Sequence, residues 1–428
     1  MTVDRRSFLK VSAASAAAGA LASAFAGCAG TGAGSGHVVV VGGGYGGAAA
    51  AKYIRLWSKG EIDVTLIERS PAFVSCPLSN LVLAGEKSMA DITVSYQGLK
   101  RHGVRVIRGE VLAIDAERRF VKLAGGDSIN YDRLVVSPGI DFIWESVPGL
   151  TPALAESKVL HAWKAGPQTL ALRRQLEDMK DGGTFALCIP RSPYRCPPGP
   201  YERACLVAGY LKRRKPKSKV LILDANEDVQ SKRGLFMKAW ADRYEGMISY
   251  LPNHGISSVD AASNTVTFEL ADPVKADVLN VIPAQMAGAI ARQAGLVTAY
   301  DHWCGIDWRT MESVAQKNIH VLGDSTLAAA AMPKAGHMAT QHAKVAAAAI
   351  VSLMSGEQPA DPMLLANVCY SFVDAKNAAH VASVHAYDAG SRTFKTVPGS
   401  GGLSHEASEV EADYAMAWAK NIWADSLG

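Results

Sequence analysis

The chain has 428 residues, a length that fits two or three domains. It carries a net charge of +4 at pH 7, and 49% of its residues are hydrophobic, which is typical of globular proteins. So small an excess of positive charge gives no support to nucleic-acid binding, and we expect no nucleic-acid partner.

Residues 1–26 are predicted to be an export signal. The paired arginines Arg5 and Arg6 precede an apolar, alanine-rich stretch, 11–26, that is too short and too weakly apolar for a membrane span. This pattern is typical of twin-arginine signals, which export proteins already folded around a cofactor. We therefore expect a periplasmic protein, exported by the twin-arginine route.

The chain has seven cysteines, and no two of them form a Cys-x-x-Cys pair. The sequence therefore predicts no metal site and no thioredoxin-like site. An oxidising compartment permits a disulfide between distant cysteines. Cys28 is a candidate for lipidation, because Ala26, Gly27 and Cys28 resemble the end of a lipoprotein signal; otherwise we expect no membrane association. Cys188, Cys205 and Cys304 are expected to pack as small apolar side chains.

The predicted fold begins with a strand, a glycine-rich turn, a helix and a second strand. His37–Val41 is a continuous run of mostly β-branched residues, as found in parallel strands buried on both faces. Glycines dominate residues 42–47, helical character extends over 48–57, and a second apolar strand is predicted over 63–67. A glycine motif in this strand–turn–helix–strand context predicts a dinucleotide-binding unit.

Each glycine of the turn has a separate role in this type of motif. Gly42 permits the tight turn, Gly44 lets the backbone approach a pyrophosphate, and Gly47 lets helix and strand pack closely. The N-terminus of the helix then faces the phosphates. Glu68, at the end of the second strand, is placed to accept hydrogen bonds from ribose hydroxyls.

Two later strand ends favour FAD over NAD as the dinucleotide. Gly139 follows the strand Arg133–Val136 and resembles the middle crossover of two-domain flavoproteins. Gly323 and Asp324 follow the apolar strand 319–322, in the arrangement by which such proteins hold the ribityl chain.

A second α/β unit follows near Gly183, with a strand at Thr184–Ile189, a helix over 201–213 and another strand at 220–223. Its first strand is followed by a proline-rich turn, 190–200, instead of a glycine motif. Proline removes the backbone donors and the flexibility that a pyrophosphate needs, so we expect no NAD(P)H substrate.

These elements predict an α/β fold with two Rossmann-like dinucleotide-binding domains of glutathione-reductase type and a smaller C-terminal α+β module. A helical region is expected over 328–353. The predicted boundaries are 37–155 and 284–355 for a discontinuous FAD-binding domain, 156–283 for the second domain, which has no nucleotide fingerprint, and 356–428 for the C-terminal module.

Four segments resemble the flavoprotein subunit of flavocytochrome c sulfide dehydrogenase. They are 161–166, 194–204, 332–336 and 367–371, and the most specific is the proline-flanked cysteine motif Tyr194-Arg195-Cys196-Pro197-Pro198-Gly199-Pro200. The resemblance implies that sulfide, a small sulfur substrate, is oxidised at a redox-active disulfide beside FAD. It also implies that electrons pass to a c-type cytochrome subunit.

The resemblance also implies roles for individual residues. Cys196 and Cys369 match the redox cysteines, and Glu202 matches an acid that manages protons near Cys196. Cys76 matches a cysteine joined covalently to the flavin, although Pro77 departs from the family pattern. Lys334, in the third segment, is expected to contact the cofactor. The C-terminal module would supply the second redox cysteine and the partner interface.

The residues alone leave several alternatives open. The cysteine pair could be an inert disulfide within a non-catalytic flavin electron-transfer module, and Glu202 a solvated glutamate at a helix start. Electrons could pass to a quinone at the membrane surface, as in sulfide:quinone oxidoreductases. No Cys-x-x-Cys-His motif occurs, so any haem would belong to a partner subunit. The C-terminal helix, 411–423, places Tyr414, Trp418 and Ile422 on one face, which could be turned to the core, to the cytochrome or to a membrane.

Overall fold

The structure is a computed structural model of the chain, and it describes residues 36–362 and 364–428. The predicted export signal and Cys28 lie outside the described residues.

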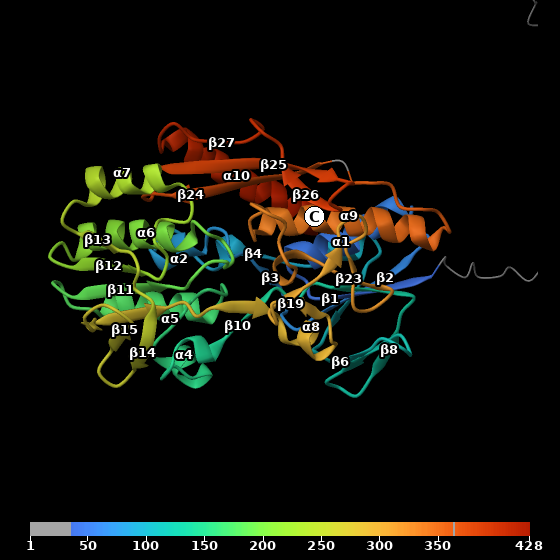
Figure 1. Ribbon diagram of the computed structural model, residues 1–428, viewed down its shortest axis with the longest axis horizontal. Coiled ribbons are helices and arrows are strands. Elements are labelled where there is room, and N and C mark those ends of the chain that lie inside the picture. Colours follow the sequence, from blue (N-terminus) through green and yellow to red (C-terminus); the bar gives the residue numbers. More distant parts are fainter. Residues whose placement is uncertain (1–35, 363) are drawn as a thin grey trace, which may run out of the picture. The chain divides into compact units, whose positions relative to one another are not determined.

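A seven-stranded sheet has the strand order β21-β22-β23-β9-β1-β2-β5. Figure 1 labels three of its strands, β1, β2 and β23. Its five strands from β23 to β5 are parallel, whereas β21 and β22 add to one edge in antiparallel orientation. The strands are β1 (His37–Val41), β2 (Asp63–Glu68), β5 (Arg105–Arg108), β9 (Arg133–Val136), β21 (Ile306–Asp307), β22 (Glu312–Ser313) and β23 (Ile319–Val321). The strands predicted at 37–41, 63–67, 133–136 and 319–322 are confirmed to within one residue.

Two helices cover one face of this sheet, α1 (Tyr45–Trp57) and α9 (Gly336–Met354). Their alanines pack against Val38, Val40 and Leu66, and small side chains let the helices approach the strands closely. The opposite face is covered by α8 (Ala289–Gln293) and by a small antiparallel sheet. The strands of that sheet are β6 (Val111–Asp115), β7 (Phe120–Leu123) and β8 (Ser128–Asn130).

Both helices begin at positions that differ from the prediction. Helix α1 starts at Tyr45, inside the glycine turn, because Gly46 and Gly47 fit into a buried first turn. Helix α9 starts at Gly336, so the helical prediction for 328–335 is wrong. In this segment Ala331 has a φ of +59°, and Pro333 disfavours helical geometry at the residue before it.

A second parallel sheet has the order β13-β12-β11-β17. Its strands are β11 (Thr184–Ile189), β12 (Lys219–Asp224), β13 (Ile248–Leu251) and β17 (Val278–Val281). One core contains residues of the helices α5 (Pro167–Asp178), α6 (Gly199–Arg214) and α7 (Arg233–Tyr244). Another contains residues of α4 (Pro152–Ser157) and of the antiparallel strands β14 (Ile256–Asp260), β15 (Thr265–Phe268) and β16 (Val274–Lys275).

The chain crosses twice between the two sheets, and the crossings pair with each other as β10 (Ile140–Phe142) and β18 (Gln285–Ala287). The predicted boundaries near residues 155 and 283 stay a prediction. Short elements complete this part of the chain: β3 (Phe73–Val74), α2 (Ser79–Leu83), β4 (Thr93–Val94), α3 (Gln97–Arg101), β19 (Val297–Ala299) and β20 (Trp303–Cys304). Three 3-10 turns lie at Ala90–Ile92, Trp144–Ser146 and Gly323–Ser325.

The C-terminal segment forms an antiparallel sheet and one long helix. Its elements are β24 (Leu364–Phe372), β25 (Ala378–Asp388), β26 (Thr393–Thr396), β27 (Gly402–Leu403) and α10 (Glu409–Leu427). Strand β24 contacts both α6 and α9, so it lies where the two halves of the fold meet. Helix α10 packs on α1, β24 and β25.

The buried stripe of α10 differs from the predicted aromatic stripe. Tyr414 is 57% exposed, whereas Ala412, Ala415, Ala419 and Ile422 are buried. Alanine's short side chain lets the helix lie close to its neighbours, which a stripe of large aromatic residues would prevent. A core-facing role is therefore wrong for Tyr414 and correct for Ile422.

Candidate functional site

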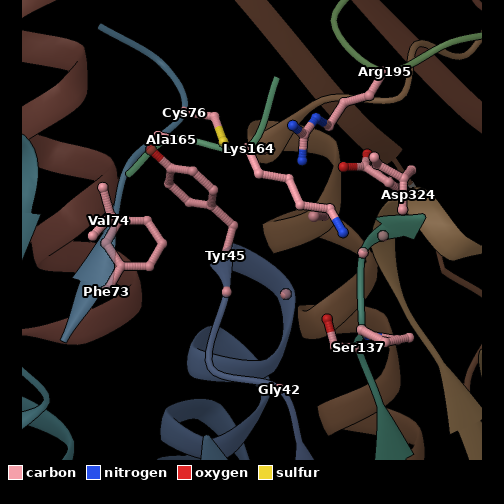
Figure 2. A pocket seen from close by; sticks show the side chains of 18 of the residues that line it. Gly42, Tyr45, Phe73, Val74, Cys76, Ser137, Lys164, Ala165, Arg195 and Asp324 are labelled. Carbon is pink, nitrogen blue, oxygen red and sulfur yellow. The ribbon is translucent and has the colours of Figure 1, made fainter. Parts of the chain in front are cut away.

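A cavity of about 530 Å³ extends from the glycine turn of β1 and α1 to the meeting point of α6 and β24. Ten of the twelve predicted site residues line it: Gly42, Gly44, Glu68, Cys76, Gly139, Cys196, Glu202, Gly323, Asp324 and Cys369. Gly47 and Lys334 do not. Figure 2 shows Cys76 on one side of this cavity, with Arg195 and Asp324 near each other across it.

Two glycines of the turn are required by close packing, whereas a third faces open space. Gly42 has a φ of +95°, and a Cβ there would lie 2.4 Å from the Ser137 carbonyl oxygen. A Cβ on Gly47 would lie 1.8 Å from the Gly42 carbonyl oxygen, so Gly47 allows the helix to pack against the turn. A Cβ on Gly44 would meet no protein atom within 4 Å. Gly44 is thus the position in the turn where a ligand group can approach the backbone closely.

Glu68 is held beside the glycine turn by two backbone donors. Its Oε2 accepts from the Gly43 amide at 2.7 Å, and its Oε1 accepts from the Ser70 amide at 2.8 Å. Both bonds fix the carboxylate at the end of β2, where it lines the cavity. The sequence predicted the position of Glu68 correctly, because the last residue of a parallel strand lies at the same edge of the sheet as the turn.

Asp324 has an unpaired polar atom at the cavity. Its Oδ1 is buried and has no hydrogen-bond partner among the described residues. Burial raises the pKa of Asp324, and the charges of Arg195 and Lys334 act in the opposite direction. A buried carboxylate oxygen without a donor fits a ligand that brings hydroxyl groups to this place.

Lys334 supports Asp324 from behind instead of lining the cavity. Its Nζ donates to the Asp324 carbonyl oxygen at 3.0 Å and to the Thr326 carbonyl oxygen at 2.5 Å. The ammonium also lies 3.7 Å from the centre of the Trp303 ring, and burial lowers its pKa to about 8. In this structure Lys334 therefore contacts the loop that carries Asp324, and its expected contact with the cofactor stays a prediction.

Cys76 lies in a turn that leads into α2. The Cys76 carbonyl oxygen accepts from the Ser79 amide at 3.0 Å and from the Ser79 hydroxyl at 2.6 Å. Leu78 adopts the left-handed region, with a φ of +71°, which allows the chain to enter α2 directly after Pro77. The side chain of Cys76 is turned into the cavity.

Cys196 and Cys369 come together although they are far apart in the sequence. Cys196 lies in the turn before α6 with a φ of +57°, and its amide donates to the Lys334 carbonyl oxygen at 2.9 Å. Cys369 lies in β24, and the thiols of the two residues are hydrogen-bonded to each other. Both are free thiols in this structure.

The two thiols have opposite pKa shifts. The hydrogen bond to Cys369 and burial raise the pKa of Cys196 well above its ordinary value. The hydrogen bond from Cys196, assisted by the charge of Lys232, lowers the pKa of Cys369 to about 6. Of the two thiols, Cys369 is thus the one that ionises more readily.

Glu202 points inward from the first turn of α6, so it is not a solvated glutamate. Its Oε2 accepts from Asn80 Nδ2 at 2.8 Å, and its Oε1 accepts from the Phe372 amide at 2.9 Å. Burial raises its pKa to about 7, against these two hydrogen bonds. Glu202 is therefore able to exchange a proton near neutral pH, in the same cavity as the cysteine pair.

A buried cation, Arg203, holds this region together. Its guanidinium donates to Asn80 Oδ1 at 3.1 Å, to Asn280 Oδ1 at 2.9 Å and to the carbonyl oxygens of His161 and Ala162 at 2.9 and 2.6 Å. Asn80 thus links Arg203 to Glu202. Sequence reasoning did not single out Arg203 or Asn80, although both lie beside residues that it did name.

Other cavity residues also escaped the sequence analysis. The Lys164 ammonium donates to Asp141 Oδ1 at 2.9 Å, and Arg195 donates to the Trp163 carbonyl oxygen. Lys164 and Arg195 lie within the segments that carry the family resemblance, which is the signal that was available for them. Nothing in the local sequence marks Lys232, which enters the region from α7.

The carboxyl edge of the second sheet is closed by its own side chains. Asp224, at the end of β12, accepts from the Tyr201 hydroxyl at 2.7 Å, the Tyr250 hydroxyl at 3.3 Å and Asn226 Nδ2 at 2.7 Å. In dinucleotide-binding domains the acid at the end of the second strand binds a ribose. Here that acid is fully buried and bonded within the protein.

No group of three or more histidine, cysteine, aspartate or glutamate side chains in 36–362 and 364–428 is arranged to hold a metal ion. Over the same residues, no helix is long and apolar enough to cross a membrane.

Family models match successive parts of the chain. Residues 36–179 match the pyridine nucleotide-disulphide oxidoreductase model, so the mixed α/β fold is of that class. Residues 169–283 match "Sulfide dehydrogenase [flavocytochrome c] flavoprotein chain, central", and 361–427 match "Flavocytochrome c sulphide dehydrogenase, flavin-binding". Residues 2–22 match the twin-arginine translocation signal, which confirms the predicted export to the periplasm.

Similar proteins agree with these matches. The mitochondrial sulfide:quinone oxidoreductase of Dictyostelium discoideum is 24% identical over 300 residues, covering 68% of this chain and 65% of the relative, so the chain spans about two thirds of it. The solved sulfide:quinone oxidoreductase of Aquifex aeolicus shares the fold with a TM-score of 0.75 and 20% identity, covering 91% of each chain. The sulfide dehydrogenase [flavocytochrome c] flavoprotein chain of Chlorobaculum thiosulfatiphilum is 57% identical over 49 residues, which are 11% of this chain and 100% of that sequence. The chain therefore belongs to the family of flavocytochrome c sulfide dehydrogenase flavoprotein chains.

Proposed function

We propose that this protein is a periplasmic, FAD-dependent enzyme that oxidises sulfide through a Cys196–Cys369 disulfide and passes the electrons to a c-type cytochrome subunit. The observation that carries the proposal is the meeting of the two thiols inside the cavity that begins at the glycine turn. A disulfide with no redox role would not need to open into a cofactor-sized cavity beside a titrating carboxyl group.

The residues that line the cavity fit FAD. Gly44 leaves room for the pyrophosphate at the N-terminus of α1, and Glu68 is placed for a ribose. The unpaired Oδ1 of Asp324 would accept from a ribityl hydroxyl. Cys76, which lines the cavity, would carry the covalent attachment that the family resemblance implies. A bound flavin supplies the ability to accept two electrons together and to release them singly, as a haem partner requires.

The closed second sheet supports the expectation that NAD(P)H is not a substrate. Asp224 has no free acceptor for a ribose, and the turn after β11 is proline-rich. Reducing equivalents would then come from the sulfur substrate alone.

The cysteine pair supplies the first chemical step. The hydrosulfide sulfur attacks Cys196 in the disulfide, a new sulfur–sulfur bond forms, and the Cys196–Cys369 bond breaks with its electron pair leaving on Cys369. The sulfide sulfur is oxidised and the disulfide is reduced. The thiol with the lower pKa leaves faster, which favours Cys369 as the leaving sulfur. Glu202 accepts the proton of the hydrosulfide, because its pKa lies near neutrality.

The same proposal assigns roles to the parts of the chain. The FAD-binding domain comprises 37–155 and 284–355, and the second Rossmann-like domain comprises 156–283. The C-terminal module, 356–428, brings Cys369 to the site and carries the interface for the cytochrome. Any haem belongs to that partner subunit.

A second candidate is sulfide oxidation with a quinone as the acceptor. It is favoured by the likeness to sulfide:quinone oxidoreductases, including the shared fold of the Aquifex aeolicus enzyme. The two candidates share the cysteine chemistry and differ in the acceptor.

Anaerobic addition of sulfide to the purified holoprotein tests the proposal. We expect sulfide to bleach the flavin absorption of the wild type and of Cys205→Ala, a control that alters a buried thiol outside the cavity. Cys196→Ser and Cys369→Ser should not bleach. Bleaching that persists in either serine variant would refute the cysteine mechanism. Reoxidation by cytochrome c, and not by a water-soluble quinone, would separate the two acceptors.

A further inference from the structure

Lys232 is a buried lysine whose position the flavin and sulfide chemistry described above does not explain. It lies at the N-terminal end of α7 in the left-handed region, with a φ of +57°, and it is only 5% exposed. Its ammonium donates to the Ser371 hydroxyl at 2.8 Å, and among the described residues it forms no salt bridge with a carboxylate. A buried ammonium with only a neutral partner is costly unless negative charge lies nearby.

The location of Ser371 identifies where that negative charge can form. Ser371 and Cys369 lie two residues apart in β24, so their side chains project from the same face of the strand. The next residue, Phe372, donates its amide to Glu202. The Lys232 ammonium is close enough to act on all three ionisable groups of this region. Its positive charge acts to lower the pKa of Cys196, Cys369 and Glu202, although the pKa of Cys196 and that of Glu202 are raised overall.

The other charged or titratable groups around the pair do not replace Lys232. The guanidinium of Arg203, on α6, donates hydrogen bonds to four neutral oxygen atoms. His337 of α9 accepts from the Val368 amide at 3.1 Å through Nδ1, and burial lowers its pKa, so it is neutral near pH 7. Arg195, next to Cys196 in the chain, donates to the Trp163 carbonyl oxygen and interacts with the charge of Cys196. Other titratable groups in the cavity lining near the pair are Cys76, Glu202 and Tyr370.

We propose that Lys232 is a positioning residue that supplies the countercharge for a thiolate on Cys369 when the cysteine pair is reduced. The proposal rests on the proposed function, in which the pair opens and closes during turnover. In the reduced state the Cys196 thiol donates to the Cys369 sulfur, and the positive charge of Lys232 stabilises the Cys369 thiolate. The arrangement selects Cys369, and not Cys196, as the sulfur that is released and held as a thiolate.

The pH dependence of cysteine alkylation tests this role without any sulfide. The holoprotein is reduced anaerobically and treated with iodoacetamide between pH 5 and pH 9, and the alkylation of Cys369 is followed by peptide mass spectrometry. The wild type should show a midpoint near pH 6. In Lys232→Met the midpoint should rise by about one pH unit or more. Alkylation of Cys369 at pH 6 should then fall about fivefold or more at constant reagent, because the thiolate fraction falls from about one half to about one tenth or less.

Three further variants distinguish charge from structural damage. Lys232→Gln should raise the midpoint to a similar extent. Lys232→Arg should keep the midpoint close to the wild-type value, because guanidinium keeps the positive charge. Lys52→Met removes another buried lysine, whose ammonium donates to the Ala424 carbonyl oxygen far from the pair, and should leave the midpoint unchanged. An unchanged midpoint in both neutral variants at position 232, or a wild-type midpoint above pH 8, would overturn the inference.

The result separates this inference from the proposed function. If the midpoint shifts as expected but sulfide does not bleach the wild-type flavin, the proposed function fails and the role of Lys232 stands. If bleaching depends on Cys369 but the midpoint does not depend on Lys232, only the inference about Lys232 fails.

Discussion

The raised pKa of Glu202 predicts a stability that depends on pH in a specific direction. The carboxyl group titrates near pH 4.5 in an unfolded chain and at about 7 in the folded protein, because of burial. The folded state therefore binds the proton more tightly, so its stability is fully present below pH 4.5 and is lost as the pH rises through 7. At about 1.4 kcal/mol per pH unit, the loss is about 3 kcal/mol.

Glu202→Gln removes this titration and keeps the size of the side chain. The variant should lose the same amount of folding stability at every pH, because its amide nitrogen faces Asn80 Nδ2, which then lacks an acceptor. The informative quantity is the difference in melting temperature between variant and wild type at each pH. For a folded unit of this size, 3 kcal/mol corresponds to about 4 °C.

Thermal unfolding of the holoprotein, followed by circular dichroism between pH 4.5 and pH 8.5, measures this difference. We expect the wild type to lose about 4 °C more than Glu202→Gln over that interval. A matched control is Glu86→Gln, on the surface near the far end of α6, which should parallel the wild type. If the difference between wild type and Glu202→Gln does not change with pH, Glu202 does not titrate near 7, and its role in proton transfer loses its basis.

Further outcomes are expected for the cofactor site and for the cysteine pair. Acid precipitation of the wild type should leave the yellow flavin in the pellet and that of Cys76→Ser should release it to the supernatant; a yellow supernatant over a colourless wild-type pellet rules out the covalent link. In a Cys76→Ser background, Asp324→Ala should weaken flavin binding by roughly 10- to 100-fold in titrations, because a buried acceptor for a ligand hydroxyl is lost, and unchanged affinity would contradict this role. Gly47→Ala should lower the melting temperature of the apoprotein by more than about 5 °C, since its Cβ would overlap the Gly42 carbonyl oxygen. Gly44→Ala should leave that temperature within about 1 °C but reduce flavin occupancy, and equal effects of the two substitutions would argue against separate roles. In the reduced wild type at pH 6.5, iodoacetamide should modify Cys369 before Cys196, and preferential modification of Cys196 would reverse the assignment of the leaving sulfur.

The sequence by itself determined the elements whose physics is local. The β-branched run His37–Val41, the glycine turn after it and the acid at position 68 all take their predicted places. A parallel strand buried on both faces and a turn that needs glycine leave few alternatives to a chain. The first residue of α1 could not be predicted from the sequence, because Gly46 and Gly47 have little helical preference by themselves. They are helical here because they are packed in the buried first turn.

The chemistry of the cysteine pair was decided only by the tertiary structure. Nothing within a few residues of Cys369 specifies that β24 will lie against α6, and Lys232 reaches the pair from a helix with no motif. The hydrogen bonds of Lys334 to the loop of Asp324 also depend on the tertiary structure, since the direction of a long side chain depends on which carbonyl oxygens surround it. Sequence motifs can therefore name the residues of such a site, whereas burial and long-range contacts set their protonation and the order in which they react.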